Sequence, residues 1–168
     1  MFRCDEYFFQ QDALDLAPEL LSCYFVINTG TEIKRFKITE VEIYRGEDDL
    51  ACHASRGRTN RTDIMYCKGG HLYIYLIYGM YWMLNIVSGK ENEPQAILIR
   101  GIEGVSGPGR VTRHLRIDKS YNGEFLVDSK RIWLEKSKEI PHYITTPRIG
   151  IDYAGEPWKS KLWRFVAC

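Results

Sequence analysis

The chain has 168 residues, of which 45% are hydrophobic and 27% are charged. This composition is typical of a folded globular protein and excludes the disordered and fibrous classes. Its length fits one domain over residues 1–168 and leaves little room for a second. No apolar run reaches the roughly 20 residues that a membrane-spanning helix needs, because Gly79 and Asn85 interrupt the longest one. Acidic residues near the N-terminus exclude a signal peptide there, so we expect a soluble protein that is not exported.

The formal net charge of +1 conceals an uneven distribution of charge along the chain. Residues 1–52 include 5 basic and 11 acidic residues, whereas residues 53–168 include 18 basic and 11 acidic residues. A basic part of this size can attract a polyanion such as a nucleic acid. The same numbers also fit a fold that interleaves the two halves, and the charges alone do not decide between these alternatives.

The cysteines indicate a reducing compartment rather than a disulfide framework, because they are odd in number and form no Cys-x-x-Cys pair. They are Cys4, Cys23, Cys52, Cys67 and Cys168. Cys52 and His53, together with Cys67 and His71, could supply four zinc ligands. The spacing is unusual, since adjacent residues ligate one tetrahedral ion with difficulty. A zinc-dependent nucleic-acid enzyme stays open as an alternative.

The first predicted elements are a helix and a strand. Residues 12–22 predict a short helix with Asp12 or Asp15 as its cap, and we expect it to bury Leu14, Leu20 and Leu21. Residues 36–45 alternate as a β-strand does. One face of this strand carries Thr39, Val41 and Ile43, and the other carries Glu40, Glu42 and Tyr44. Two carboxylates and a tyrosine are ordinary on a solvated face, but they indicate chemistry if the face lines a cleft.

Residues 71–87 predict a β-hairpin that turns at residues 78–80, with Gly79 as the turn former. Tyr78 lies at its tip, where packing in a core cannot account for a large aromatic side chain. Asn85 is a polar residue in a hydrophobic strand, so it needs hydrogen-bond partners if it is buried.

Residues 95–100 predict a further strand that ends in Arg100. Residues 107–119 then predict a short helix that begins with Gly-Pro-Gly and has a base at every third position: Arg110, Arg113, Arg116 and Lys119. Such a helix can bind phosphate, although a solvated basic face also explains the pattern. We expect the last edge strand at residues 147–152. Strands in the centre with helices at the margins favour an α+β fold.

Several common enzyme classes are excluded, because the sequence contains no P-loop, no Gly-x-Gly-x-x-Gly, no Gly-x-Ser-x-Gly and no His-Glu-x-x-His. The chain instead combines an acid beside aromatic residues with a histidine, a basic segment and a tyrosine-tipped hairpin. Cations hold phosphates and flat rings stack on bases, and a protruding aromatic side chain can take the place of a displaced nucleotide. These features indicate an enzyme that flips a base into an aromatic pocket beside a carboxylate.

The run EVEIYRGEDDLACHASRGRTNRTDIM is followed in order by HLYIYLIYGMYWMLNIV, AILIR, SGPGR and PRIGI. These blocks resemble the alkyladenine (3-methyladenine) DNA glycosylase family, also called the N-methylpurine DNA glycosylases. The resemblance implies a compact α+β fold around a curved antiparallel β-sheet, with a protruding hairpin and flanking helices. It also implies a monofunctional, cofactor-free and metal-free monomer, which excises alkylated or deaminated purines from double-stranded DNA to start base-excision repair. From the small size of the chain we expect an enzyme of the cytoplasm. A non-catalytic damaged-DNA-binding protein on the same scaffold is the alternative.

The resemblance assigns a role to each residue of the expected site. Glu42 matches the general base that activates the attacking water, with Glu40 a weaker candidate. Arg100 matches the arginine that orients this water and the adjacent phosphate. The residues that match the sandwich around the extruded base are Tyr44, His53 and Tyr75.

Other residues match contacts with DNA. Asn85 corresponds to the asparagine that crowds the 2-amino group of normal guanine, and Tyr78 corresponds to the tyrosine that intercalates into the vacated space. We expect five arginines to touch backbone phosphates: Arg56, Arg58, Arg61, Arg110 and Arg113. No lysine matches a Schiff-base role, so cleavage of the strand at the abasic product is not expected.

Two segments depart from the family pattern. The segment at residues 101–106 is shorter than the corresponding family segment. The C-terminal run WRFVAC differs from the family ending that supplies a backbone carbonyl to the water site. Val166 and Ala167 are the two candidates for that carbonyl.

Overall fold

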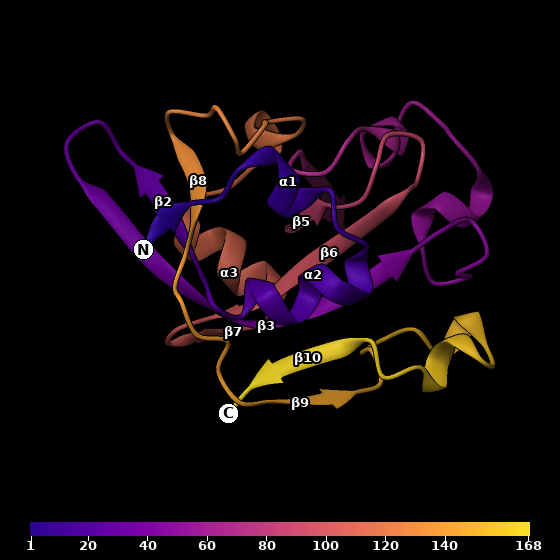
Figure 1. The fold of residues 1–168 in the computed structure, drawn as a ribbon. Coiled ribbons are helices and arrows are strands. Elements are labelled where there is room, and N and C mark those ends of the chain that lie inside the picture. Colours follow the sequence, from indigo (N-terminus) through magenta and orange to yellow (C-terminus); the bar gives the residue numbers. More distant parts are fainter.

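The long strand β3 (Ile33–Arg45) has partners on both of its edges. The computed structural model describes residues 1–168, and in it β3 pairs along one edge with β6 (Gln95–Ile102). Along the other edge it pairs first with β2 (Cys23–Asn28) and then, over residues 40–42, with β10 (Arg164–Ala167). Figure 1 shows β9 and β10 beside β3. The pairing on both edges satisfies the backbone groups of the segment that carries the predicted acids.

Ten strands form one antiparallel sheet in the order β1–β8–β2–β3–β6–β5–β4, with β7 beside β6 and β9 beside β10. The other strands are β1 (Phe2–Arg3), β4 (Leu72–Ile77), β5 (Tyr81–Val87), β7 (Val105–Ser106), β8 (Ile132–Lys136) and β9 (Tyr143–Thr146). The α-helices are α1 (Glu6–Phe9), α2 (Ala13–Leu20) and α3 (Pro108–Leu115). Short 3₁₀-helices lie at His53–Arg56, Asp63–Tyr66, Lys119–Tyr121, Asp152–Ala154 and Trp158–Ser160. This arrangement confirms the predicted α+β fold.

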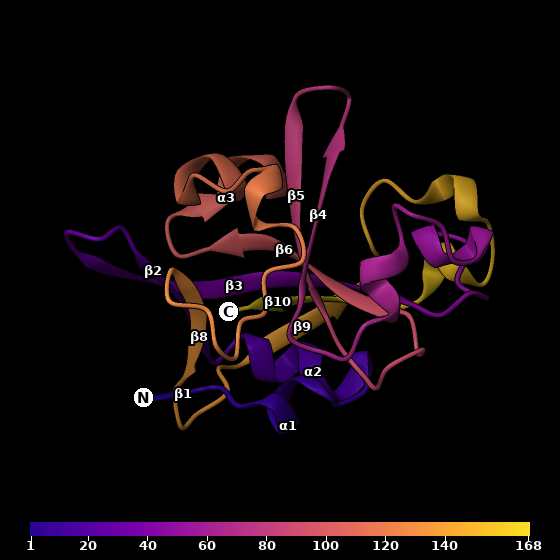
Figure 2. The same cartoon turned by 90° about the horizontal axis from the view of Figure 1, so that it is seen from above.

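The helices cover opposite faces of the sheet. Figure 2 shows α1 and α2 on one side of β3 and α3 on the other. Leu16 and Leu20 of α2 and Val111 and Leu115 of α3 join a core of 27 buried apolar residues. None of the helices combines the length and the apolar character that a membrane span requires.

Helix α2 lies where the sequence predicts it, with one correction to its packing. Asp12 is the N-cap, and its carboxylate accepts a hydrogen bond from Leu14 N–H. Leu20 and Leu21 are fully buried as predicted, but the prediction for Leu14 is wrong, since it is 40% exposed. Leu16 is buried instead, because the side of the helix that meets the sheet contains residue 16 rather than residue 14.

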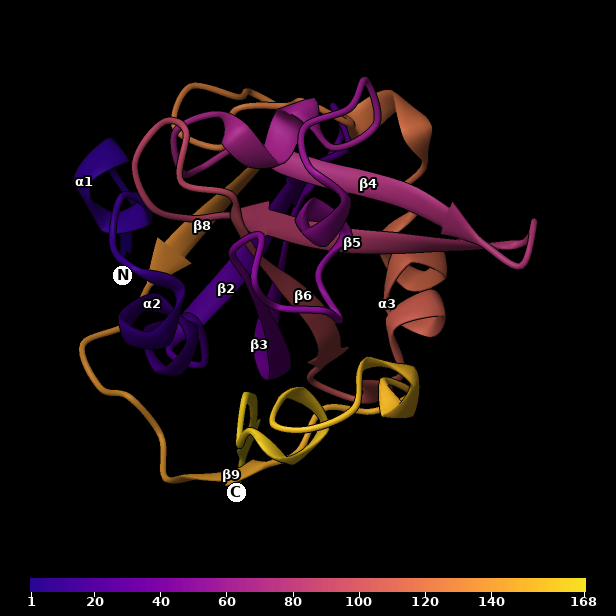
Figure 3. The same ribbon diagram turned by 90° about the vertical axis from the view of Figure 1, so that its right-hand side faces the viewer.

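The predicted β-hairpin is confirmed. Strands β4 and β5 pair from Leu72 opposite Ile86 to Ile77 opposite Tyr81, and they turn at residues 78–80. Tyr78 and Gly79 have positive φ angles of 51° and 65°, as the two central residues of a type I′ turn do. Figures 2 and 3 show the hairpin projecting beyond the rest of the fold.

Two loops, at residues 147–152 and 101–106, concern segments about which the sequence makes a prediction. Residues 147–152 form no strand, so the predicted edge strand there is wrong, and β9 and β10 are the last strands instead. The reason lies in a buried arginine within this loop, described below. The short segment at residues 101–106 closes as a tight hairpin between β6 and β7, with residues 101 and 102 opposite residues 106 and 105.

Candidate active site

A cavity of about 380 Å³ is lined by side chains of β3, β4, β5 and β6 and by residues 149–153. Most of its lining is aromatic or aliphatic. The structure brings together in this lining six of the residues predicted for the site, namely Tyr44, His53, Tyr75, Tyr78, Asn85 and Arg100. Cavities with apolar walls and a few convergent polar groups are typical binding sites for small molecules and bases.

Glu42 lies against the wall of this cavity and is fully buried. The hydroxyl of Tyr44 donates a 2.9 Å hydrogen bond to its Oε2, and the N–H of Ile149 donates a 2.8 Å hydrogen bond to its Oε1. The Nε atom of Arg100 is 3.5 Å from the same Oε1. Since all three partners also line the cavity, they connect the buried carboxylate to it.

The electrostatic surroundings of Glu42 act in two directions. Burial raises the pKa of Glu42 above its ordinary value, because the ionised carboxylate loses hydration. The charge of Arg100 and the hydrogen bonds from Ile149 and Tyr44 partly counteract this rise. A carboxyl group with a raised pKa at the wall of an apolar cavity is a candidate for acid–base chemistry.

A β-bulge sets the position of Arg100. Residues 40 and 41 of β3 pair with residues 101 and 99 of β6, so Arg100 is an extra residue with no partner on β3. Its Nε donates a 2.9 Å hydrogen bond to Glu40 Oε1. Glu40 and Glu42 lie toward this arginine from one strand face, as predicted, and both are buried rather than solvated. The alternative of a solvated acidic face is therefore wrong.

The aromatic wall is centred on His53 and Tyr75, whose ring centroids are 4.6 Å apart in an edge-on arrangement. His53 Nδ1 shares a 2.9 Å hydrogen bond with the hydroxyl of Tyr73. Burial and the nearby charges of Arg61 and Arg56 lower the pKa of His53 to about 4, so the imidazole is neutral at pH 7. The alternation of β4 predicts that Tyr73 and Tyr75 share a face, but the sequence assigns no role to Tyr73.

Asn85 is buried in the cavity wall. Its amide nitrogen donates a 3.1 Å hydrogen bond to the backbone oxygen of Tyr73 on the neighbouring strand. This is the partner that a polar residue in a hydrophobic strand requires, and it fixes the orientation of the amide.

Tyr78 is 85% exposed at the tip of the hairpin. Its φ of 51° lies in the left-handed region, which costs a non-glycine residue about 1–2 kcal/mol. A large aromatic side chain in a strained and exposed position gains nothing from packing, so the fold does not account for it.

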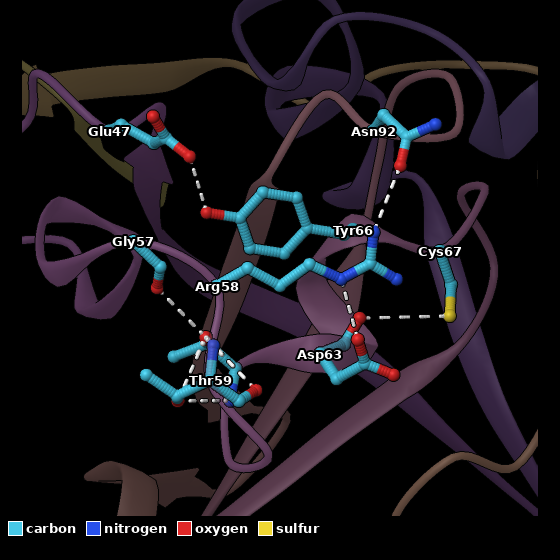
Figure 4. Close-up of polar contacts among 9 residues, drawn as sticks. Glu47, Gly57, Arg58, Thr59, Asp63, Tyr66, Cys67 and Asn92 are labelled. Atoms are coloured by element: carbon cyan, nitrogen blue, oxygen red, sulfur yellow. Dashed lines mark hydrogen bonds and ion pairs between the residues drawn. The ribbon is translucent and has the colours of Figure 1, made fainter.

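The predicted phosphate-binding arginines lie on the two segments that flank the hairpin, α3 and residues 53–66 (Figure 2). Four of them are exposed and form no ion pair: Arg56, Arg61, Arg110 and Arg113. Arg58 is held instead, because its guanidinium contacts Asp63 at 2.6 Å and Asn92 at 3.1 Å and lies over the ring of Tyr66 (Figure 4). A phosphate at Arg58 therefore has to compete with Asp63.

Helix α3 packs closely on the hairpin through Gly109. A Cβ atom at this position would lie only 2.8 Å from the ring of Tyr81. The second glycine of the Gly-Pro-Gly run thus brings the basic helix next to the hairpin.

A buried ion pair holds the loop that donates to Glu42. Arg148 contacts the two carboxylate oxygens of Asp49 at 2.7 and 3.0 Å, and both side chains are fully buried. The guanidinium also lies 5.1 Å from the ring centroid of Tyr44. This pair anchors the loop so that the N–H of Ile149 reaches Glu42. No local pattern predicts the pair, because the partners are 99 residues apart.

The last strand completes the surroundings of the acids. In β10, Arg164 is opposite Glu42 and Val166 is opposite Glu40. The Nε of Arg164 donates a 2.6 Å hydrogen bond to Glu40 Oε1. Of the C-terminal residues, Arg164 is thus the one paired with Glu42, and the sequence did not single it out.

The four candidate zinc ligands Cys52, His53, Cys67 and His71 do not come together in one site. His53 Nδ1 bonds to Tyr73, and His71 Nδ1 bonds to the backbone oxygen of Lys68. No group of three or more His, Cys, Asp or Glu side chains is arranged to hold a metal ion. The zinc alternative therefore has no ligand set in this structure.

The α+β fold thus places a buried carboxylate behind an aromatic cavity, beside an exposed aromatic tip. A sequence model of the methylpurine-DNA glycosylase family matches residues 7–107 and 104–168. The two matches overlap at residues 104–107, which include β7. The chain belongs to the methylpurine-DNA glycosylase family.

Curated relatives agree with this assignment. A protein of Natranaerobius thermophilus is 38% identical over 97% of this chain and 94% of its own length. Proteins of Borrelia garinii subsp. bavariensis and Legionella pneumophila are each 40% identical, over 96% and 94% of this chain and 94% and 90% of their own lengths. Each of the three is named "Putative 3-methyladenine DNA glycosylase".

Proposed function

We propose that this chain is a monofunctional DNA glycosylase that hydrolyses the N-glycosidic bond of alkylated or deaminated purines flipped out of duplex DNA, and so starts base-excision repair. The observation that carries this proposal is Glu42, a fully buried carboxylate held by three groups that line an aromatic cavity. The family and the names of the relatives support DNA and a methylated purine as the substrate.

In the proposed reaction Glu42 is the general base. It takes a proton from a water molecule whose oxygen forms a bond to C1′ of the flipped nucleotide. The C1′–N bond breaks, and its electron pair leaves with the purine. The sugar becomes positively charged in the transition state, so an ionised Glu42 also stabilises that charge. Arg100, 3.5 Å from Glu42, orients the water and the neighbouring phosphate.

The flipped purine stacks in the cavity against Tyr44, His53 and Tyr75. Such stacking contributes about 1–3 kcal/mol per base and tolerates different bases, which suits an enzyme with several substrates. A neutral His53 does not repel the positive charge of an N-alkylated purine, and aromatic faces attract it. Asn85 stands against the 2-amino group of normal guanine and so disfavours it.

The hairpin and the flanking arginines hold the DNA. Tyr78 fills the space that the flipped nucleotide leaves, as exposed wedge residues do. Arg56, Arg61, Arg110 and Arg113 contact backbone phosphates, and Arg58 does so only when a phosphate displaces Asp63.

The remaining parts of the proposal follow from the resemblance to the family. We expect residues 1–168 to act as one domain and as a monomer, without a cofactor or a metal ion, in the cytoplasm. No residue is assigned to strand cleavage, so the product is an abasic site in an intact strand.

Single-turnover excision tests the proposal. The substrate is a duplex oligonucleotide with one hypoxanthine or one ethenoadenine, and Glu42→Gln is the matched variant, since glutamine keeps the size of the side chain. We expect the wild type to release the free base with or without a chelator, and the variant to bind the lesion but lose release by about 10²- to 10⁴-fold. Tight lesion binding without release of these bases or of 3-methyladenine by the wild type would favour the damaged-DNA-binding alternative. Loss of activity with the chelator would return metal chemistry to consideration.

A further inference from the structure

Glu40 has no part in the proposed reaction, yet it is buried at the centre of the charged groups around Glu42. One of its oxygens, Oε1, accepts hydrogen bonds from Arg100 Nε at 2.9 Å and from Arg164 Nε at 2.6 Å. These arginines come from β6 and β10, the strands on the two sides of β3. Arg164 is further held by a 3.0 Å hydrogen bond from its Nη1 to Thr146 Oγ1.

The geometry places both arginines closer to Glu40 than to the base. Arg100 Nε is 2.9 Å from Glu40 and 3.5 Å from Glu42, so its N–H is committed to Glu40. Arg164 is opposite Glu42 in the strand pairing, but its ion pair is also with Glu40. Two guanidinium groups are therefore next to the proposed base, while the Nε atom of each donates its hydrogen bond to Glu40.

The other charged groups near Glu42 are already paired. The hydroxyl of Tyr44, on the same strand, donates a hydrogen bond to Glu42. Arg148, which reaches the ring of Tyr44 from the loop at residues 147–151, is neutralised by Asp49. If Glu40 loses its charge, Glu42 becomes the nearest carboxylate for both Arg100 and Arg164. An opposite charge at such a distance stabilises the ionised form and weakens it as a base.

We propose that Glu40 is a positioning residue: it holds Arg100 and Arg164 by their Nε atoms and thereby keeps Glu42 free to accept the proton of the attacking water. This inference rests on the proposed function. It assigns to Glu40 a role other than that of a second base, because its carboxylate is occupied by the two arginines.

Glu40→Gln tests the inference in the excision assay. We expect the rate of base release to fall by about 10- to 100-fold, as for a slightly misplaced catalytic group, while binding of the lesion duplex is retained. The acid limb of the rate–pH profile should move to lower pH, because Glu42 then keeps its charge more tightly. Glu40→Asp keeps the charge and should restore part of the rate. Glu135→Gln is the matched control. Glu135 on β8 accepts a 2.8 Å hydrogen bond from Arg35, which lies near the start of β3 and away from Glu40 and Glu42, so this variant should leave the rate and the profile unchanged.

A second measurement does not depend on catalysis. The ¹³C signal of the Glu42 side-chain carboxyl, identified by its absence in Glu42→Gln, gives the protonation of this group directly. In Glu40→Gln its titration midpoint should move to lower pH. An unmoved midpoint overturns the inference, and so does a rate loss that only follows a fall in Tm with an unmoved acid limb. If the wild type releases no base, the proposed function fails, but the titration still decides whether Glu40 controls Glu42.

Discussion

Tyr44 contacts Glu42 and the cavity at once: its hydroxyl donates a 2.9 Å hydrogen bond to Glu42 Oε2, and its ring is part of the cavity lining. The proposed stacking surface and the proposed base are therefore joined by one side chain. If a bound purine shifts the ring of Tyr44, the hydrogen bond from Tyr44 to Glu42 changes with it.

Tyr44→Phe separates these two roles. The ring remains, so binding of a lesion duplex should change little. The hydrogen bond from Tyr44 lowers the pKa of Glu42, so its loss should raise that pKa and move the acid limb of the rate–pH profile to higher pH. A hydrogen bond to a charged group is worth about 1.5–3 kcal/mol, so release below the wild-type midpoint should slow by about tenfold or more. Single-turnover rates of base release, measured from about pH 5 to about pH 8, test this prediction. An acid limb that moves to lower pH would contradict it.

Glu42→Gln should stabilise the folded protein at neutral pH. Burial raises the pKa of Glu42 in the folded state, so the folded state binds this proton more tightly than the unfolded state. The stability that comes with the proton is present below the unfolded pKa and is lost as the pH rises through the folded pKa. The variant carries no such loss, so its Tm should exceed that of the wild type at pH 7, and the difference should shrink toward pH 4. Thermal melts across this range check the sign, and a lower Tm of the variant at pH 7 would contradict it.

Tyr78→Gly should affect DNA binding without harming the fold. Glycine adopts the positive φ of this position without strain, and the 85% exposed side chain contributes no packing. The relief of about 1–2 kcal/mol of strain is partly offset by the extra entropy that glycine loses on folding, about 0.5–1 kcal/mol, so the free energy of unfolding should rise by about 1 kcal/mol or less. Binding to a lesion duplex should weaken more than binding to undamaged DNA. Tyr7→Ser, at an aromatic residue that is 82% exposed in α1, is the control, and equal weakening of both duplexes by Tyr78→Gly argues against a wedge.

The salt dependence of DNA binding should distinguish the arginines. Each lost phosphate contact reduces the slope of log K against log salt by about 0.9. Arg110→Ala and Arg61→Ala should each reduce it by about this amount, since both residues are exposed and neither has an acidic partner. Arg58→Ala should reduce it less, because Asp63 already holds Arg58. Fluorescence anisotropy at several salt concentrations measures the slopes, and an equal reduction by all three contradicts the distinction.

The predictable part of the site is the part that depends on local periodicity. A period of two in β3 places Glu40, Glu42 and Tyr44 on one face, and Gly79 places Tyr78 at a turn. The buried side of α2 is harder to predict, because no local pattern shows which side of the helix faces the sheet. The prediction that Leu14 is buried is wrong for this reason.

The unpredicted part depends on pairings between distant segments. The loop at residues 147–152 alternates like a strand, but the buried pair of Arg148 with Asp49 ties it down as a loop. The pairing of β10 with β3 has no local signal either, so Arg164 was not recognised. The sequence places Glu40 beside Glu42, but only the fold shows that Glu40 binds two arginines.

The strand order also has a consequence for the time at which this site forms. Glu40 and Arg164 are 124 residues apart, so a ribosome that has synthesised β3 still has most of the chain to make. Until β10 arrives, the edge of β3 at residues 40–42 has no partner, and two carboxylates next to each other lack one of their two arginines. The ion pair between Glu40 and Arg164 is therefore absent until β10 has been synthesised. The group of charged side chains around Glu40 and Glu42 is complete only after β10, one of the last strands to be synthesised, has paired with β3.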